Sequence, residues 1–210
     1  MRLRFFGNIV HSVLENLVSD TKPIVYEELE SEYEIQKSKF DPDKKISGDL
    51  VSAGKTILDE FYDQNEGSTF RVFDKEYEFN FVLGNYNIIG FIDRIDLFDD
   101  EVLIIDYKTG KWEVAQKDVP TNLQLGMYAL AVSLIFPDKK ITAELYYLRS
   151  GRRKRHTFSR EDIENVKLNI INSINEIVKD ISFRPTSNSR ICSYCEHAKS
   201  GACPTRSIQK

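Results

Sequence analysis

Two segments of this chain have the composition of β-strands, yet an acidic residue interrupts each of them. Asp93 lies within the segment 88–98, and Asp106 lies within the segment 102–108. Asp99 and Asp100 between them form a turn signal, so we expect the two strands to pair as a hairpin. A carboxylate among apolar strand residues is costly unless it has a partner, and a divalent cation is the simplest partner for two of them.

Lys108 extends this pattern, because it lies two residues beyond Asp106. Side chains alternate along a strand, so Asp106 and Lys108 are expected on one face. Two carboxylates and an ammonium group on one side of a sheet are the groups that metal-assisted hydrolysis of a phosphodiester requires.

The order of the expected elements indicates an α/β fold. The N-terminal third has helical spacing of its apolar residues, including a helix over about 46–63, and strands follow at 70–83, 86–98 and 102–108. A helix over 123–136 precedes a second hairpin with strands at 143–149 and 154–158. The capping signature at Ser159 opens a long final helix. A chain of 210 residues fits one domain of ordinary size.

Composition excludes several classes of protein. Hydrophobic residues make up 41% of the chain and charged residues 30%, as in soluble globular proteins. The chain has no apolar run of membrane-spanning length and no signal-peptide stretch after Met1, so we expect a cytoplasmic protein without a membrane partner. A formal charge of -4 excludes a basic nucleic-acid coat, but local basic clusters can still hold DNA phosphates.

Four short motifs follow one another along the chain. They are Gly7-Asn8-Ile9-Val10-His11, Gly90-Phe91-Ile92-Asp93-Arg94-Ile95-Asp96, Asp106-Tyr107-Lys108-Thr109-Gly110 and Gln124-Leu125-Gly126-Met127-Tyr128. With these motifs in this order, the chain resembles the PD-(D/E)xK nuclease superfamily, and within it the RecB-like branch. The resemblance implies a restriction-endonuclease-like core, in which helices flank a mixed central β-sheet. We accordingly expect a nuclease domain over 1–185, helical over 1–66 with its core at 67–185, and a cysteine-containing tail over 186–210.

The resemblance also implies a set of metal ligands. In this chain they are Asp93, Asp106, the main-chain carbonyl of Tyr107, and His11 on the first helix. Oxygen ligands of this kind suit Mg²⁺ or Mn²⁺, and a histidine ligand favours Mn²⁺ somewhat.

Further site residues follow from the same resemblance. Lys108 is expected to position the attacking water or to stabilise the phosphorane. Gln124 and Tyr128 share one helix face and are expected to contact the scissile phosphate or the lysine. Glu76, on the strand before the hairpin, is a secondary candidate that would support the site.

Each of these residues also has an ordinary structural interpretation. Asp93 can form an ion pair with Arg94 or Lys108, and a lone helical histidine is commonly a solvated or satisfied core residue. Arg94 and Asp96 fit a supporting or surface pair better than metal ligands. Glu76 fits a solvated strand, and Gln124 and Tyr128 fit an exposed helix face.

Three cysteines, Cys192, Cys195 and Cys203, resemble the last three ligands of the iron–sulfur staple of many RecB-like nucleases. A [4Fe–4S] site needs four thiolates, and the residues before His11 contain no cysteine. Either the chain is part of a longer helicase–nuclease whose first cysteine is missing, or the cluster is degenerate. His197 lies too close to Cys195 for a standard zinc site. We favour a truncated staple and expect no cluster unless a fourth ligand is supplied.

Five cations crowd the second hairpin: Arg149, Arg152, Arg153, Lys154 and Arg155. A solvated turn is the ordinary interpretation of such a cluster. The functional interpretation is a phosphate clamp that gives a nuclease sequence-independent electrostatic attraction to DNA.

Taken together, these features predict a metal-dependent deoxyribonuclease, expected to act as an exonuclease on single strands or duplex ends. It is expected to work in DNA repair or recombination, with a helicase domain or subunit as partner. A CRISPR-associated adaptation nuclease is the alternative within the enzyme class. A catalytically silent DNA-binding or scaffold module is the alternative outside it, and the motifs do not exclude RNA as substrate. The presence of His11, Asp93, Asp106 and Lys108 favours activity.

Overall fold

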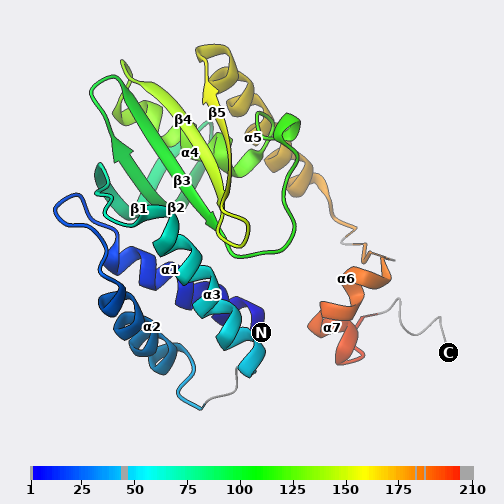
Figure 1. Ribbon diagram of the computed structural model, residues 1–210. Helices are drawn as coiled ribbons and strands as arrows, with labels where there is room; N and C mark the ends of the chain where they lie inside the picture. Colours follow the sequence, from blue (N-terminus) through cyan, green and yellow to red (C-terminus); the bar gives the residue numbers. More distant parts are fainter. Residues whose placement is uncertain (1, 44–46, 183, 187, 204–210) are drawn as a thin grey trace. The chain divides into compact units, whose positions relative to one another are not determined.

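The computed structural model of the chain describes residues 2–43, 47–182, 184–186 and 188–203 (Figure 1). The chain forms two compact units, residues 1–171 and residues 172–210, and the boundary between them falls within helix α5 (Arg160–Lys179). The second unit contains the short helices α6 (Ser189–Tyr194) and α7 (Glu196–Lys199). The expected division at residue 185 stays a prediction.

Three helices form the N-terminal part of the first unit: α1 (Arg2–Leu17), α2 (Tyr26–Phe40) and α3 (Gly48–Asn65). Apolar residues recur on α1 at helical spacing and are buried at Phe6, Ile9, Val10, Val13 and Leu14. They share one core with residues of the other two helices and of the sheet: Leu29, Tyr33, Ile57, Leu58, Phe61, Ile105, Tyr107, Tyr146 and Leu148. The three helices therefore cover one face of the sheet.

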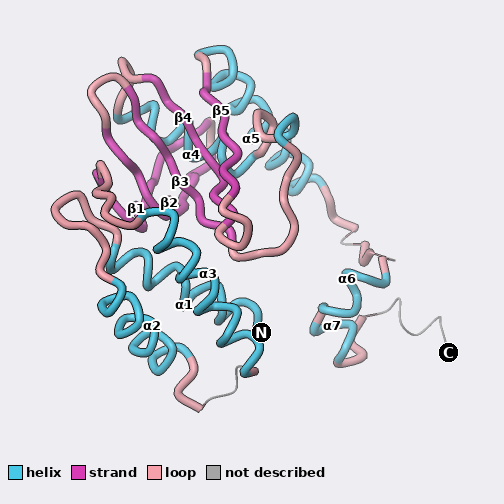
Figure 2. The backbone as a smooth tube through the Cα atoms, viewed as in Figure 1, coloured by secondary structure: helices cyan, strands magenta, loops and turns pink. Residues whose placement is uncertain are grey.

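The sheet has five strands in the order of the chain: β1 (Val72–Leu83), β2 (Tyr86–Leu97), β3 (Glu101–Lys108), β4 (Lys140–Tyr147) and β5 (Arg152–Phe158). All neighbours are antiparallel except β3 and β4, which are parallel. Parallel neighbours need a crossover connection. Here it runs through a short 3₁₀ helix, η1 (Gln116–Asp118), and helix α4 (Leu123–Ile135) (Figure 2).

Strand alternation separates the residues of β3 into two sets. Ile105 and Tyr107 belong to the core formed with α1–α3, so Asp106 and Lys108 lie on the opposite face. Helix α4 packs against β3 and β4. A Cβ atom on its Gly126 would lie 2.8 Å from Val166 Cγ2, so the glycine is what lets α4 approach α5.

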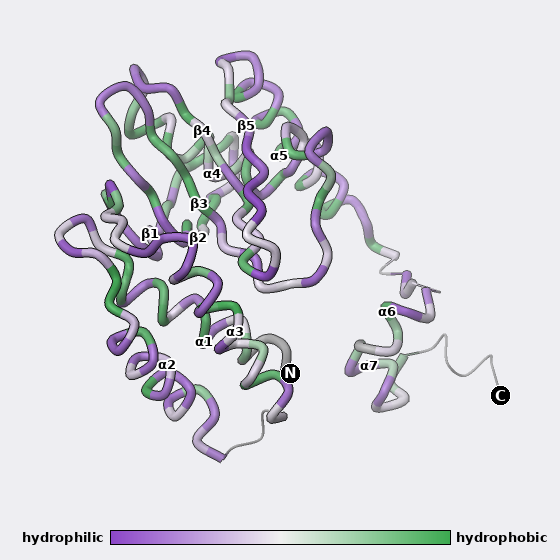
Figure 3. The backbone as a smooth tube through the Cα atoms, in the orientation of Figure 1, coloured by the Kyte–Doolittle hydropathy of each residue, from purple (hydrophilic) through white to green (hydrophobic). Residues whose placement is uncertain are grey.

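The expected α/β architecture, a mixed sheet flanked by helices, is confirmed. The capping signature is also present at the start of α5, where the Asp162 N–H donates to Ser159 Oγ at 3.1 Å and the Ser159 N–H donates to Asp162 Oδ2 at 2.8 Å. Figure 3 shows that β3 is largely hydrophobic whereas β5 is hydrophilic. In the described part of the chain, no helix combines the length and the apolar character needed to cross a bilayer.

Besides Asp106, charged residues are buried in the sheet at two places among the described residues. The Arg94 guanidinium lies 3.0 Å from Asp96 Oδ2 and donates to the Tyr107 hydroxyl at 2.6 Å. Burial raises the pKa of Asp96, and the opposing effect of Arg94 is smaller. Glu144 on β4 is fully buried, with Arg153 at 3.2 Å and Arg155 at 2.7 Å from its carboxylate oxygens. Two arginines of β5 thus compensate one buried carboxylate.

This arrangement predicts unequal effects of removing the two sides of the ion pairs. Replacing Arg153 and Arg155 together with leucine leaves the Glu144 carboxylate buried without its arginines, so we expect a loss of about 3–5 kcal/mol in the free energy of unfolding. Glu144→Gln should cost less, because both arginines reach solvent. Urea denaturation measures both values. A double arginine variant as stable as Glu144→Gln would contradict the assignment.

Candidate active site

The candidate site lies where two neighbouring strands separate. The β2–β3 ladder ends at the pair Arg94–Ile105, although β2 continues alongside β1 and β3 continues alongside β4. Beyond that pair, the Tyr107 N–H donates to the Asp93 carboxylate at 2.6 Å instead of to a carbonyl of β2. The Asp93 side chain therefore occupies the fork between the strands, and it is largely buried there.

Helix α1 supplies a histidine to this fork. His11 Nδ1 lies 3.4 Å from Asp93 Oδ1, and the imidazole ring packs edge-on against the Tyr107 ring with centroids 6.2 Å apart. Burial acts to lower the pKa of His11. The hydrogen bond to Asp93 and the negative charges of Asp93, Asp106 and Glu76 outweigh it, so the pKa is raised. The fork is thus strongly anionic and attracts a positive charge.

Glu76 of β1 completes a group of possible metal ligands. One ligand atom from each of His11, Glu76 and Asp93 lies within 4.8 Å of the others, and no further group of this kind occurs among the described residues. Glu76 is also the one described residue other than glycine with a positive φ, 46°. Such a backbone costs about 1–3 kcal/mol and persists where the surroundings impose it. Burial and then the charge of Asp93 raise the pKa of Glu76.

Asp106 and Lys108 form a second pair beside this group. Lys108 Nζ lies 2.6 Å from Asp106 Oδ2, and the Asp106 side chain is almost completely buried while Lys108 is one third exposed. Burial, followed by the charge of Asp93, raises the pKa of Asp106 to about 6 against the opposing effect of Lys108. The charge of Asp93 therefore acts on Asp106, although Asp106 is not one of the three members of the His11–Glu76–Asp93 group.

Two residues of α4 hold the lysine from the other side. Lys108 Nζ donates to Gln124 Oε1 at 2.9 Å, and Gln124 Nε2 donates to the Tyr128 hydroxyl at 2.7 Å. Burial raises the pKa of Tyr128, so its hydroxyl stays protonated. The Asn122 side chain caps α4 by accepting from the Leu125 N–H at 3.0 Å, which fixes the first turn that carries Gln124.

The Phe79 ring lies between Tyr128 and the motif residue Gly90. Phe79 of β1 packs edge-on against Tyr128 with centroids 5.9 Å apart. Phe79 faces Gly90 across the β1–β2 ladder, and a Cβ at position 90 would lie 2.5 Å from Phe79 Cζ. The missing side chain of Gly90 thus makes room for the ring that supports Tyr128.

The structure brings together His11, Glu76, Asp93, Asp106, Tyr107, Lys108, Gln124 and Tyr128 from five elements. Imidazole and carboxylate donors fit Mn²⁺ or Mg²⁺, so the donor set is suitable for the expected ion. Arg94 and Asp96 form a buried pair, not a surface pair, and Arg94 reaches this set by donating to the Tyr107 hydroxyl. The metal-binding and catalytic roles stay predictions.

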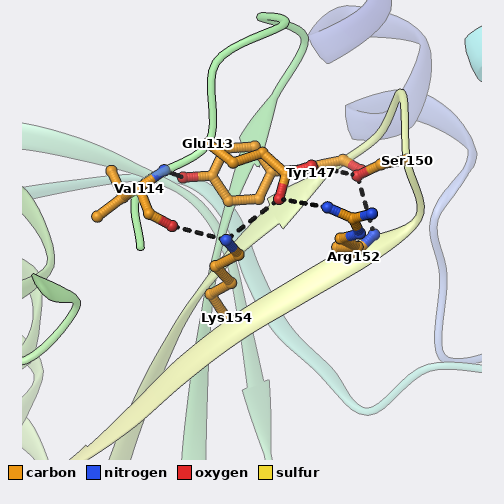
Figure 4. Close-up of polar contacts among 6 residues, drawn as sticks. All are labelled: Glu113, Val114, Tyr147, Ser150, Arg152 and Lys154. Carbon is orange, nitrogen blue, oxygen red and sulfur yellow. Dashed lines mark hydrogen bonds and ion pairs between the residues drawn. The ribbon is translucent and has the colours of Figure 1, made fainter. Parts of the chain in front are cut away.

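The cations of the second hairpin do not gather on one face. Arg153 and Arg155 pair with Glu144 on one side of β5, whereas Arg152 and Lys154 lie 3.5 and 3.2 Å from Glu113 on the other (Figure 4). Arg149 donates from Nε to the Thr109 carbonyl at 2.7 Å. Four cations of β5 share two carboxylates, which leaves an excess of two positive charges.

Glu113 is a residue that the motif analysis did not identify. It belongs to the loop after β3, and its carboxylate accepts from Ser150 Oγ at 2.7 Å as well as facing Lys154 and Arg152 (Figure 4). The hydrogen bond from Ser150, followed by the nearby cations, lowers the pKa of Glu113. The sequence signal for its role is an acidic residue shortly after the motif lysine, in a chain that also has a basic hairpin.

The three cysteines belong to the second unit. Cys192 and Cys195 are partly exposed and Cys203 is buried, and the Cys195 N–H donates to the Cys192 carbonyl at 3.3 Å. The absence of a bound iron–sulfur cluster stays a prediction.

The geometry of the fork predicts that Glu76 contributes to metal affinity. Glu76→Gln keeps the shape of the side chain but removes its charge, so we expect Mn²⁺ binding to weaken about 10-fold or more in isothermal titration calorimetry. Glu78→Gln is the matched control, because Glu78 is exposed two residues further along β1. Equal Mn²⁺ affinity in the two variants would exclude Glu76 from the site.

Comparisons with known proteins identify the family to which the chain belongs. The family model described as PD-(D/E)XK nuclease superfamily matches residues 2–204. No curated protein matches the chain. A crystal structure named as a candidate exonuclease from Eubacterium rectale shares 12% identity and has a TM-score of 0.51, over 95% of this chain and 74% of that one. The structure of SSO0001 shares 14% identity over 96% and 95% of the two chains, but its TM-score of 0.37 supports no argument. With nearly its whole length matched by the family model, the chain belongs to the PD-(D/E)XK nuclease superfamily.

Proposed function

We propose that this chain is a divalent-metal-dependent deoxyribonuclease of the RecB-like branch, acting as an exonuclease within a DNA-repair or recombination helicase–nuclease. The observation that carries the proposal is the fork between β2 and β3, where His11, Glu76 and Asp93 lie beside the Asp106–Lys108 pair. The name of the Eubacterium rectale protein supports the exonuclease mode. The helicase partner rests on the resemblance of the motifs alone.

The residues of the fork have separate tasks in this proposal. His11, Glu76 and Asp93 would hold the ion, with Asp106 and the Tyr107 carbonyl as the further expected ligands. A bound Mg²⁺ or Mn²⁺ lowers the pKa of a water molecule and stabilises charge on the phosphate. Lys108 supplies a positive charge at the partly exposed side of the fork, where the phosphate gathers negative charge during hydrolysis.

The lysine needs to be held in place for this task. Asp106 and Gln124 contact its ammonium group from two sides, and Gln124 is itself fixed by Tyr128. This chain of contacts limits the rotamers of Lys108, so less conformational freedom is lost when the phosphate binds. The presence of all these contacts favours an active enzyme over a silent DNA-binding module.

Cleavage assays test the proposal directly. Purified protein should degrade labelled single-stranded and duplex DNA with Mn²⁺ or Mg²⁺ and show no cleavage with EDTA. Asp106→Ala should lower the rate about 100-fold or more, because a ligand and the partner of Lys108 are both lost. Asp100→Ala, in the exposed β2–β3 turn, is the control. A folded Asp106→Ala protein with an undiminished rate would refute the proposal. Persistence of a closed circular substrate indicates the exonuclease mode.

The excess charge of the β5 network suggests where DNA phosphates bind. Arg152 is 71% exposed and only weakly engaged by Glu113, so it is the hairpin cation best placed for a phosphate. In an Asp106→Ala background, Arg152→Gln should lower the slope of log affinity against log salt by roughly one. Lys167→Gln is the control, because Lys167 is a partly exposed cation of α5 that pairs with Glu164. Equal slopes and affinities in the two variants would remove Arg152 from the DNA-binding surface.

A further inference from the structure

The loop after β3 presents one large aromatic side chain to solvent. Trp112 is the single tryptophan of the chain, and it is 86% exposed. It follows Lys108 by four residues, so the two Cα atoms lie no more than about 14 Å apart even in a fully extended chain. At a rise of about 3.4 Å per nucleotide, this distance corresponds to at most about four stacked nucleotides. Trp112 is therefore within reach of a strand bound at the fork.

The backbone that carries Trp112 is firmly held. Next to it, Glu113 faces Ser150, Arg152 and Lys154, and the Val114 N–H donates to the Tyr147 hydroxyl at 2.8 Å (Figure 4). The Val114 carbonyl accepts from Lys154 Nζ at 2.7 Å. These contacts pin the loop to the β4–β5 hairpin on the C-terminal side of the tryptophan. A ligand that binds the indole ring then loses little loop entropy.

Two exposed cations lie beside Trp112 in the chain or contact its neighbour Glu113. Lys111 precedes Trp112 and is exposed, and the exposed Arg152 contacts Glu113 directly after it. Proteins that bind single strands combine aromatic rings for the bases with cations for the backbone. In a duplex the faces of the bases are covered by their neighbours, so a ring of this kind selects unpaired nucleotides.

We propose that Trp112 stacks on an unpaired base of the nucleic-acid strand within about four nucleotides of the scissile phosphate, and thereby makes the enzyme prefer single-stranded or frayed substrate. This inference rests on the proposed function and names its substrate class. The Glu113 anchor sets the position of the ring, and Lys111 and Arg152 contact the flanking phosphates. Cleavage chemistry remains with the fork.

The single tryptophan makes the test specific, because all indole fluorescence of the protein comes from Trp112. The titrant is single-stranded oligothymidylate, added to Asp106→Ala protein without metal. Stacking should quench the emission, and the quench should saturate at the same concentration as the fluorescence anisotropy of a dye-labelled oligothymidylate. A blunt-ended duplex that is shown to bind by anisotropy should quench less.

Variants separate stacking from general attraction. Trp112→Ala should weaken single-strand binding roughly 5- to 150-fold and leave the salt slope unchanged, because no phosphate contact is lost. Trp112→Phe should retain most of the affinity. Phe98→Ala is the matched control, since Phe98 is an exposed aromatic residue in the turn that precedes β3, at the opposite end of that strand from Lys108.

Two results would overturn the inference: binding by anisotropy with unchanged indole emission, or a Trp112→Ala protein that binds oligothymidylate as tightly as Phe98→Ala. If the wild-type protein with Mn²⁺ still cleaves DNA in either case, only the stacking role fails. If the protein neither binds nor cleaves nucleic acid, the proposed function fails as well, and the exposed ring then belongs to a contact with another protein.

Discussion

One hydrogen bond determines the layout of the site: the Tyr107 N–H donates to the Asp93 carboxylate instead of to a carbonyl of the neighbouring strand. A buried backbone N–H needs a partner, and here a side chain supplies it. Because the ladder stops at Arg94–Ile105, β2 turns away with β1 while β3 stays with β4. The space between the two strand pairs receives His11, Glu76 and Asp106. A continuous ladder would close the fork.

Buried carboxylates of the same sheet occur in two different environments, the fork and the arginine network around Glu144. On the side of the fork, burial and then the charge of Asp93 raise the pKa values of Glu76 and Asp106, which is a state that a bound cation relieves. On β4 and β5, the buried Glu144 is compensated by two arginines. One arrangement leaves negative charge uncompensated at a place where a metal ion can bind, and the other neutralises it within the fold. Burial alone therefore does not distinguish a functional carboxylate from a structural one.

Residues that depend on local patterns were predicted well from the sequence. Strand alternation placed Asp106 with Lys108, and helical spacing placed Gln124 with Tyr128. Glu76 was only a secondary candidate, because its segment fits an ordinary solvated strand. Its positive φ interrupts the strand alternation, and the sequence contains no sign of it. The partners of the basic hairpin were also not foreseen. Glu113 and Glu144 reach it through the tertiary fold, and cation spacing along the sequence contains no information about either.

Gly90 explains why the motif around Asp93 contains a glycine: its role is in packing. Gly90 has no functional group, yet Phe79 fills the space above its Cα and supports Tyr128. Tyr128 in turn fixes Gln124, and Gln124 holds Lys108. Each member of this series is packed or hydrogen-bonded, so a displacement at one end has little room to dissipate. The position of Lys108 therefore depends partly on the absence of a Cβ atom at Gly90 on the neighbouring strand. In this protein, the position of the proposed catalytic lysine depends on a residue that has no side chain.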